Sequence, residues 1–297
     1  MSLIETAKRT LPDAVKRRFD LRTKERVKDT LRRSIVAVRT RAAGDRPLPS
    51  IIIAGAQKGG TTTLHSLLAQ HPLVVPGLTK EIHFYSLHYS RGTRWYQAHY
   101  PRTNVSGDHV QMACDATPYY MFHPNAMSRI AADLPDAYVI LMLRNPVDRT
   151  YSSYQHQVQR GRETLSFEDA IRAEPERLAG EAQKMEADPS YFSFAHIYFS
   201  YVSRSEYHWQ VARCQKLFAP ERLLILKSEE FFANSAQVYS QVLRFLNLPE
   251  RKAIRYANVN KKHYNPMKIS TRRKLEQHFK PHNDRLYEDL GTSFEWR

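Results

Sequence analysis

Residues 50–64 read Ser-Ile-Ile-Ile-Ala-Gly-Ala-Gln-Lys-Gly-Gly-Thr-Thr-Thr-Leu, an apolar strand pattern followed by a glycine-rich loop and the start of a helix. A loop that binds nucleoside triphosphates has a glycine, four residues, a second glycine, a lysine, and then a serine or threonine. Gly55 and Gly60 have this spacing, but Thr61 stands at the lysine position and Lys58 lies inside the loop. Backbone N–H groups and the helix dipole still favour an anion here. The stretch therefore predicts a phosphate site that is poorly suited to hydrolysing ATP or GTP, with an ordinary glycine turn as the alternative.

Strand-like and helical patterns alternate along the chain after Ser50. Apolar runs typical of strands lie at 51–54, near Val74, and at 112–114, 138–143 and 223–226. Helical patterns lie at 62–70, 124–133, 146–160, 167–179, 207–218 and 237–245. Such alternation is typical of a parallel sheet with helices on both faces. We therefore expect an α/β fold, a P-loop-like three-layer α/β/α arrangement with a central parallel sheet, in a single catalytic domain at 50–297.

A basic segment at residues 1–46 precedes this domain. It holds 14 lysines and arginines against six acidic residues, and the whole chain has a formal net charge of +15. Apolar residues recur in it at helical spacing, at Val27, Leu31, Ile35 and Val38. This pattern predicts one or two amphipathic helices, which lie either on an anionic membrane or against the domain. Phe19 is the one aromatic residue of the segment, so we expect no nucleic-acid partner.

Cysteine content and hydropathy indicate the compartment. Cys114 and Cys214 lack the spacing of metal ligands and are too few for a disulfide framework, so we expect buried thiols and no metal site. The apolar runs are strand-sized, and the amino terminus lacks the apolar core of a signal peptide. We therefore expect a cytoplasmic protein, with peripheral contact with the inner face of a membrane through residues 1–46 as a further possibility.

A second motif follows the strand pattern at 138–143. Arg144 stands at the carboxyl end of this strand, and Ser152 lies two turns into the following helix. An arginine with a nearby hydroxyl can hold a phosphate monoester. A structural pair between Arg144 and Asp148 is an equally good interpretation of these residues alone.

A third motif is Lys80-Glu81-Ile82-His83-Phe84-Tyr85-Ser86. If this segment is extended, Glu81, His83 and Tyr85 point to one side, because side chains alternate along a strand. A carboxylate that faces a cleft can act as a general base toward a hydroxyl group. A surface strand with solvated charges is the alternative.

Together the three motifs, in this order, resemble the sulfotransferase superfamily. The resemblance covers most of the chain after Ser50 and is closest to the carbohydrate branch, the heparan sulfate glucosaminyl sulfotransferases and related bacterial enzymes. It implies transfer of a sulfuryl group from 3′-phosphoadenosine 5′-phosphosulfate (PAPS) to a hydroxyl group, or alternatively an amine, of a carbohydrate or glycolipid acceptor. The products would be the sulfated acceptor and adenosine 3′,5′-bisphosphate. This donor requires no metal, which would explain the unusual loop.

The resemblance also implies roles for individual residues. Glu81 would be the base, Lys58 would stabilise the leaving phosphate, and His83 would orient Glu81 or the acceptor. Lys80 would contact the acceptor together with Glu81 and His83. The remaining donor-binding residues would be Gln57, Gly59, Gly60, Thr61, Thr62 and Thr63 around the 5′-phosphate, Arg144 and Ser152 at the 3′-phosphate, and Lys261 and Lys262 in a covering loop.

Two differences from the family pattern concern the acceptor. Members with a glucosaminyl acceptor often have a lysine at the position of Ala116, and the small-molecule branch usually has a tryptophan where this chain has Leu64. Two other functions remain as alternatives. One is a P-loop kinase or nucleotidase that uses ATP with magnesium, and the other is a module that binds a membrane or a polyanion through the basic segment.

Overall fold

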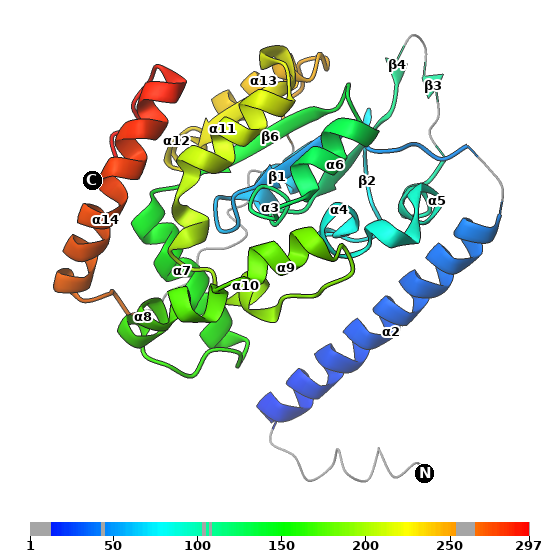
Figure 1. Cartoon of the computed structure of the whole chain (residues 1–297). Helices are drawn as coiled ribbons and strands as arrows, with labels where there is room; N and C mark the ends of the chain where they lie inside the picture. The colour runs from blue at the N-terminus through cyan, green and yellow to red at the C-terminus, as the bar shows by residue number, and fades with distance from the viewer. Residues whose placement is uncertain (1–12, 43–44, 103–104, 107–108, 254–264, 297) are drawn as a thin grey trace, which may run out of the picture.

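The computed structural model describes residues 13–42, 45–102, 105–106, 109–253 and 265–296. A five-stranded parallel sheet lies at its centre, with the strand order β2-β5-β1-β6-β7 (Figure 1). The strands are β1 (Ile51–Gly55), β2 (Val74–Pro76), β5 (Met112–Ala116), β6 (Tyr138–Leu143) and β7 (Leu223–Lys227). The expected three-layer α/β fold with a central parallel sheet is confirmed.

The middle strands are apolar because both of their faces are covered. Ile51, Ile52 and Ile53 of β1 are fully buried. The register pairs Ile51 with Cys114 of β5 on one side and with Tyr138 of β6 on the other. These strands therefore show near-continuous apolar runs rather than the alternating pattern of a sheet with one solvated face.

Helices cover both faces of the sheet. On one face α6 (Ala126–Asp133) and α11 (Tyr207–Leu217) pack against even-numbered β1 residues such as Ile52, with α14 (Ile269–Leu290) outside α11. On the other face α3 (Thr61–Leu68) and α13 (Ser235–Phe245) pack against Ile51 and Ile53. The remaining elements are α4 (Phe84–Leu87), α5 (Thr93–Gln97), the hairpin β3 (Val105–Ser106) and β4 (His109–Val110), α7 (Pro146–Gln159), α8 (Phe167–Leu178), α9 (Glu181–Ala187), α10 (Phe194–Tyr198), α12 (Ser228–Ala233), and the 3-10 turns η1 (Tyr89–Arg91), η2 (Ser203–Ser205) and η3 (Pro220–Arg222).

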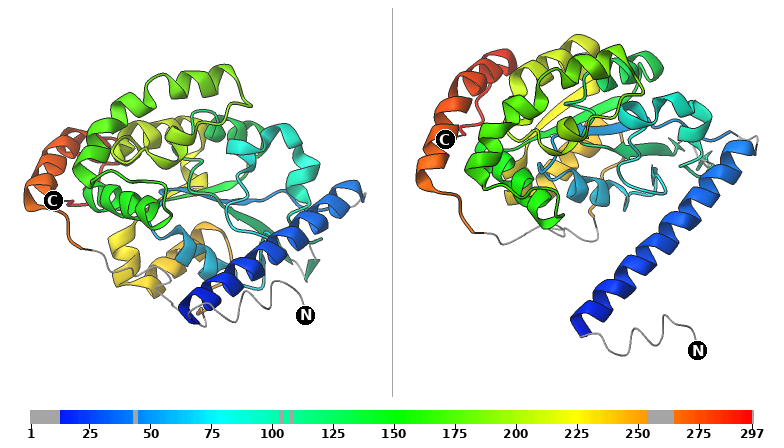
Figure 2. Two further views of the ribbon diagram at one scale, coloured as in Figure 1. Left: turned by 90° about the horizontal axis from the view of Figure 1, so that it is seen from below. Right: turned by 60° about the horizontal axis from the view of Figure 1, so that its bottom comes forward.

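The described part of the basic segment contains one long helix, α2 (Asp13–Arg41), that lies beside the domain and extends beyond it (Figures 1 and 2). Its C-terminal half meets α5, where Val36 is buried and Arg39 Nη1 donates to the carbonyl of Tyr100 at 3.3 Å. The apolar residues Val27 and Leu31 are 54% and 58% exposed. Helix α2 is therefore docked at one end and keeps an exposed apolar row.

The extended interpretation of residues 80–86 was wrong. Glu81 and His83 have φ values of 61° and 57°, and the helix α4 begins at Phe84. Tyr85 is buried in the core with the aromatic residues of α5 instead of lying beside Glu81. Tertiary contacts with the end of β5, described below, impose this bent course on the segment. The part of the chain that the structure describes has no helix with an apolar stretch long enough to cross a bilayer.

Candidate active site

The loop between β1 and α3 packs so closely on the sheet that its glycines are required. A Cβ atom added to Gly59 would lie 2.3 Å from the carbonyl oxygen of Met142. Gly60 has a φ of +97° and ends the loop at the first turn of α3. Lys58 also has a positive φ, of 73°. The loop therefore has a fixed backbone course, which brings the N-terminus of α3 to the carboxyl edge of the sheet.

Two buried arginines hold this loop from behind. Arg149 is fully buried, and its Nε donates to the backbone carbonyl of Gln57 at 3.1 Å. Arg204 Nη1 donates to Oε1 of the Gln57 side chain at 3.1 Å. Ser228, which follows β7 and begins α12, donates to the carbonyl of Gly59 at 2.6 Å. The side-chain carbonyl of Gln57 is thus bonded to the protein itself, which makes Gln57 an anchor of the loop.

A cavity of about 750 Å³ lies in front of the loop and is called the donor cavity below. It brings together residues that the sequence predicted from three separate motifs, namely Gln57, Lys58, Gly60, Thr61, Thr62, Thr63, Glu81, Arg144 and Ser152. Thr63 Oγ1 is buried and has no hydrogen-bond partner among the described residues. A buried hydroxyl normally has a partner, so an anionic group at the start of α3 fits this wall. Lys261 and Lys262 lie outside the described residues.

Arg144 reaches the donor cavity from the end of β6. Its Nη1 donates to the carbonyl of Lys58 at 3.3 Å. Asn145 then caps α7 by accepting from the N–H of Val147 at 3.0 Å, and Ser152 follows in the buried second turn. Asp148 forms an ion pair with Arg272 of α14. The alternative interpretation of the sequence, in which Asp148 pairs with Arg144, is therefore not what the structure shows.

Glu81 and His83 lie together despite the bend in their segment. Glu81 Oε2 lies 3.6 Å from His83 Nε2, and Glu81 Oε1 accepts from Lys80 Nζ at 2.7 Å. Desolvation raises the pKa of Glu81, but the hydrogen bonds and charges of His83 and Lys80 outweigh it and lower the pKa to about 2. Glu81 is therefore ionised at neutral pH, as a base must be, but a pKa this low makes it a weak base until the contacts with His83 and Lys80 change. His83 Nδ1 lies 3.1 Å from Ser86 Oγ, which orients the ring.

The end of β5 positions this segment. The N–H of Glu81 donates to the carbonyl of Ala116 at 3.2 Å, and the N–H of His83 donates to Thr117 Oγ1 at 3.4 Å. Thr117 Oγ1 in turn donates to the carboxylate of Asp115 at 2.7 Å. Asp115 is buried, so desolvation raises its pKa, and its carboxylate also accepts from the hydroxyl of Tyr96 at 2.7 Å. These contacts fix the place of Glu81 at the carboxyl edge of the sheet.

Several residues of the site were missed from the sequence. Ser228 and Glu229 line the donor cavity because they follow the carboxyl end of β7, and the rule for parallel sheets could have found them. Phe232 adds a partly exposed aromatic ring to the wall. A smaller cavity of about 200 Å³ has Gln57, Glu81, His83 and Arg160 in its lining, and Arg160 also lines the donor cavity. No local pattern pointed to Arg160, which comes from the end of α7.

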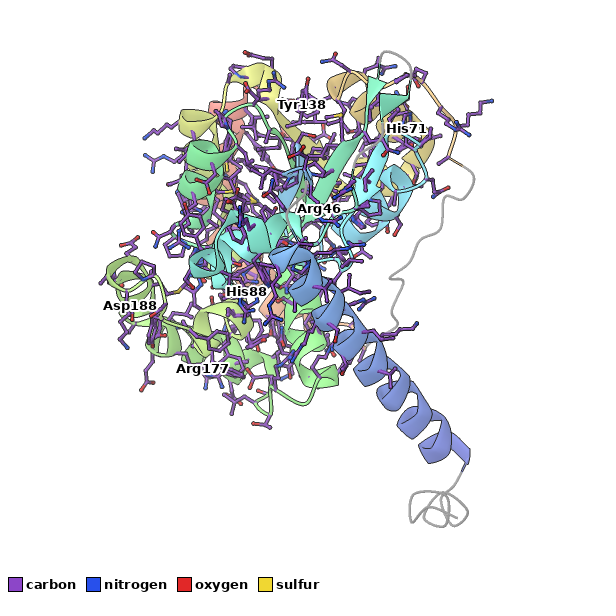
Figure 3. All side chains as sticks on the ribbon, turned by 90° about the vertical axis from the view of Figure 1, so that its right-hand side faces the viewer. Arg46, His71, His88, Tyr138, Arg177 and Asp188 are labelled. Carbon is purple, nitrogen blue, oxygen red and sulfur yellow. The ribbon has the colours of Figure 1, made fainter. Side chains whose placement is uncertain are left out.

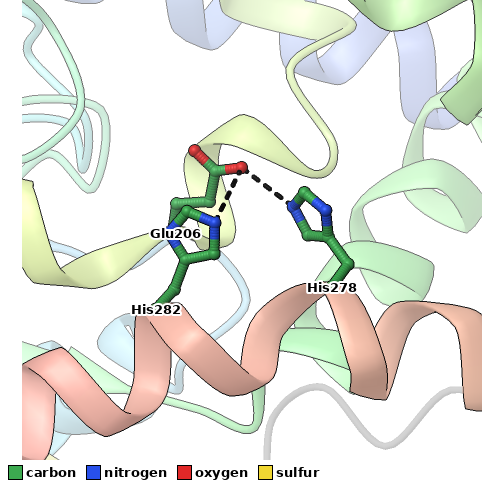
Figure 4. Close-up of side chains that lie close together, drawn as sticks. All are labelled: Glu206, His278 and His282. Carbon is green, nitrogen blue, oxygen red and sulfur yellow. Dashed lines mark hydrogen bonds and ion pairs between the residues drawn. The ribbon is translucent and has the colours of Figure 1, made fainter.

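A separate cluster joins α14 to the start of α11 (Figure 4). His278 Nε2 lies 2.9 Å from Glu206 Oε1, and His282 Nε2 lies 3.8 Å from the same oxygen. His282 Nδ1 faces His208 Nδ1 at 3.2 Å. Among the described residues, Glu206, His278 and His282 form the group whose ligand atoms lie close enough to hold a metal ion, within 4.8 Å of one another. The cluster lies apart from the donor cavity and serves here as an ion pair between two helices.

The comparisons with known proteins agree with this geometry. The family model described as "Sulfotransferase domain" matches residues 48–297. Membrane-associated sulfotransferase kil1 of Dictyostelium discoideum is 24% identical over 315 residues, which cover 84% of this chain and 67% of that protein. Heparan sulfate glucosamine 3-O-sulfotransferase 6 of Homo sapiens is 28% identical over 265 residues, covering 85% and 75% respectively.

A solved structure adds to these matches. The crystal structure of a sulfotransferase from Alicyclobacillus acidocaldarius has a TM-score of 0.65 and 26% identity, covering 84% of this chain and 98% of that one. The chain spans 23% of the length of a bifunctional heparan sulfate N-deacetylase/N-sulfotransferase 1 from Caenorhabditis briggsae, which it also matches. The family model covers most of the chain, including every residue that lines the donor cavity. The chain therefore belongs to the sulfotransferase domain family and is an enzyme that transfers sulfuryl groups.

Proposed function

We propose that this enzyme transfers a sulfuryl group from PAPS to a hydroxyl group of a carbohydrate or glycolipid, with an amine as the alternative acceptor group. The observation that carries the proposal is the donor cavity, in which Lys58, Arg144 and Glu81 meet from three different strand ends. The heparan sulfate sulfotransferases among the relatives support a carbohydrate acceptor. The catalytic domain is proposed to span residues 50–297.

The donor site has two anion-binding ends. The loop amides and the hydroxyls of Thr61, Thr62 and Thr63 would hold the 5′-phosphate, since they surround the N-terminus of α3. Arg144 and Ser152 would hold the 3′-phosphate, which distinguishes PAPS from ATP. Both ends lie in one cavity of about 750 Å³, a volume within the ordinary range for nucleotide-sized ligands.

Glu81 and Lys58 would carry the transfer itself. The acceptor oxygen forms a bond to sulfur while the bond between sulfur and the bridging oxygen of the donor breaks. Glu81 takes the proton of the acceptor, and the electron pair stays on the bridging oxygen, where Lys58 stabilises the developing negative charge. His83 would keep the Glu81 carboxylate in place. Lys80 shares that carboxylate, so it would also lie next to the bound acceptor.

Two features support a cytoplasmic enzyme with peripheral contact with a membrane. Cys114 and Cys214 are buried free thiols. The exposed apolar row of α2, flanked by lysines and arginines, has the composition of a helix that lies on anionic lipid. Co-sedimentation of the full chain with vesicles containing phosphatidylserine tests this contact, and equal sedimentation with purely zwitterionic vesicles would contradict it.

The donor proposal is tested with the nucleotide product. We expect adenosine 3′,5′-bisphosphate to raise the melting temperature of the protein by mass action and ATP with magnesium to raise it much less. Labelled PAPS should then transfer its sulfuryl group to a heparosan oligosaccharide. A larger stabilisation by ATP than by the bisphosphate would contradict the proposal.

A further inference from the structure

A second large cavity, of about 680 Å³, lies between α2 and the body of the domain and is called the α2 groove. Figure 3 looks onto this side of the molecule, with His88 and Arg46 near the end of α2 that meets the domain. The groove residues of α2 form one stripe at helical spacing, namely Asp29, Arg32, Arg33, Val36, Ala37, Thr40 and Arg41. The exposed row with Val27 and Leu31 lies on another side of the helix, since those residues do not line the groove.

The groove leads to the proposed base. Glu81 lines both the α2 groove and the donor cavity. A ligand that lies in the groove can therefore reach the segment that carries Glu81. Helix α2 precedes the region matched by the family model, which begins at residue 48, so this wall is an addition to the shared domain.

Positive charge dominates the groove. Its lining includes Arg32, Arg33, Arg41 and Arg91. The two acids of the lining are Glu81 and Asp29, and Asp29 pairs with Arg32 at 3.2 Å. A cavity lined by an excess of one charge concentrates ligands of the opposite charge. The groove thus favours a ligand that carries carboxylate or sulfate groups.

His99 on the groove wall has the marks of a binding group. It is 7% exposed, and both ring nitrogens are buried and have no hydrogen-bond partner among the described residues, so a ligand would reach them only after a small movement of the ring. Burial, with nearby positive charge, lowers the pKa of His99 to about 4, so at neutral pH the ring has one N–H donor and one acceptor. The ring of Trp95 lies beside it, with centroids 4.5 Å apart. An unpaired donor and acceptor next to an aromatic ring match the hydroxyls and the apolar face of a sugar.

We propose that the α2 groove binds an anionic saccharide, the part of the acceptor that adjoins the hydroxyl presented to Glu81. His99 hydrogen-bonds a sugar hydroxyl, Trp95 contacts a ring, and arginines such as Arg33 and Arg91 pair with carboxylate or sulfate groups. This inference rests on the proposed function, because it extends the acceptor side of the same site. The bond from Arg39 to the carbonyl of Tyr100, just after α5, and the burial of Val36 keep the helical wall in position.

The test measures binding of a fluorescent heparosan octasaccharide, which carries carboxylates, to the full chain saturated with adenosine 3′,5′-bisphosphate. Arg33→Glu should raise the Kd roughly tenfold, as loss and reversal of one charge contact would. Lys28→Glu makes the same charge change on the same helix, outside the groove lining, and should have much less effect. Equal weakening by the two variants would mean diffuse attraction to the basic helix and would overturn the proposal.

A second pair of variants separates binding from folding. His99→Leu removes groups that have no partner in the free protein, so the melting temperature should stay equal or rise while octasaccharide binding weakens roughly tenfold. His99→Gln should restore part of the binding. A lower melting temperature with unchanged binding would assign His99 a structural role and refute the inference. If adenosine 3′,5′-bisphosphate binds but the octasaccharide does not, the groove proposal fails while the donor proposal stands; if the bisphosphate does not bind, the proposed function itself fails.

Discussion

Arg144 permits a test of the donor site that needs no acceptor. Its guanidinium lines the donor cavity, and a hydrogen bond to a charged group contributes about 1.5–3 kcal/mol. Arg144→Ala should therefore raise the Kd for adenosine 3′,5′-bisphosphate roughly 10- to 150-fold. The Kd for AMP, which has no 3′-phosphate, should rise less than about threefold, because the bond from Arg144 to the Lys58 carbonyl is long, at 3.3 Å, and weak.

Isothermal titration calorimetry of adenosine 3′,5′-bisphosphate and AMP, each with the wild-type protein and with Arg144→Ala, gives a complete thermodynamic cycle. The difference between the two nucleotides isolates the contribution of the 3′-phosphate from any change in the loop. Ser152→Ala is the matched comparison, with a smaller expected loss of about 0.5–1.5 kcal/mol for the bisphosphate. Equal losses for the bisphosphate and AMP in Arg144→Ala would show that Arg144 acts by shaping the loop, and the assigned role would be wrong.

Three further predictions concern the base, the loop and the helix contact. Glu81→Gln should lower kcat about 10²- to 10⁴-fold while the Kd for adenosine 3′,5′-bisphosphate stays unchanged. Transfer of label from PAPS measures kcat, and calorimetry measures the Kd. An unchanged kcat would exclude Glu81 as the base. Gly59→Ala places a Cβ against the Met142 carbonyl and should destabilise the fold by about 1–3 kcal/mol and weaken nucleotide binding. Urea unfolding measures the stability and calorimetry the nucleotide Kd, and a variant with both values unchanged would contradict this prediction. The bond that His278 donates to Glu206 raises the pKa of His278 above 6.5, so its stabilisation is present below pH 6.5 and is lost as the pH rises through the raised pKa. Because the pair is exposed, it contributes at most about 1 kcal/mol, and His278→Gln should remove this part of the pH dependence in thermal unfolding; an identical pH profile would rule it out.

The sheet could be predicted from the sequence because its strands are buried on both faces. The run at 138–143 forms β6 over the same residues, and the run at 51–54 forms β1 with Gly55 added. Burial of both faces leaves a continuous apolar signal that needs no knowledge of neighbouring elements. The two-residue strands β3 and β4 gave no such signal, because each is too short to show a period.

The bent segment around Glu81 could not be predicted in the same way. Its course depends on hydrogen bonds to Ala116 and Thr117, which lie more than thirty residues away in the chain. The role of Gln57 was hidden for the same reason, because Arg204, which holds its side chain, is 147 residues distant. Local propensity carries no information about such partners. The motifs therefore predicted residues that line one cavity, and the long-range contacts decided how their side chains are held there.

The shared position of Glu81 has a consequence for the order of binding. Among the residues that the structure describes, Glu81 is the one that lines both the donor cavity and the α2 groove. A nucleotide in the first therefore leaves the second open, and a saccharide in the groove does not cover the nucleotide. If the donor cavity and the α2 groove bind the substrates that we propose, each substrate has its own entrance, and the kinetic scheme should be a random-order ternary complex, in which the spent nucleotide can leave while the sulfated sugar is still bound.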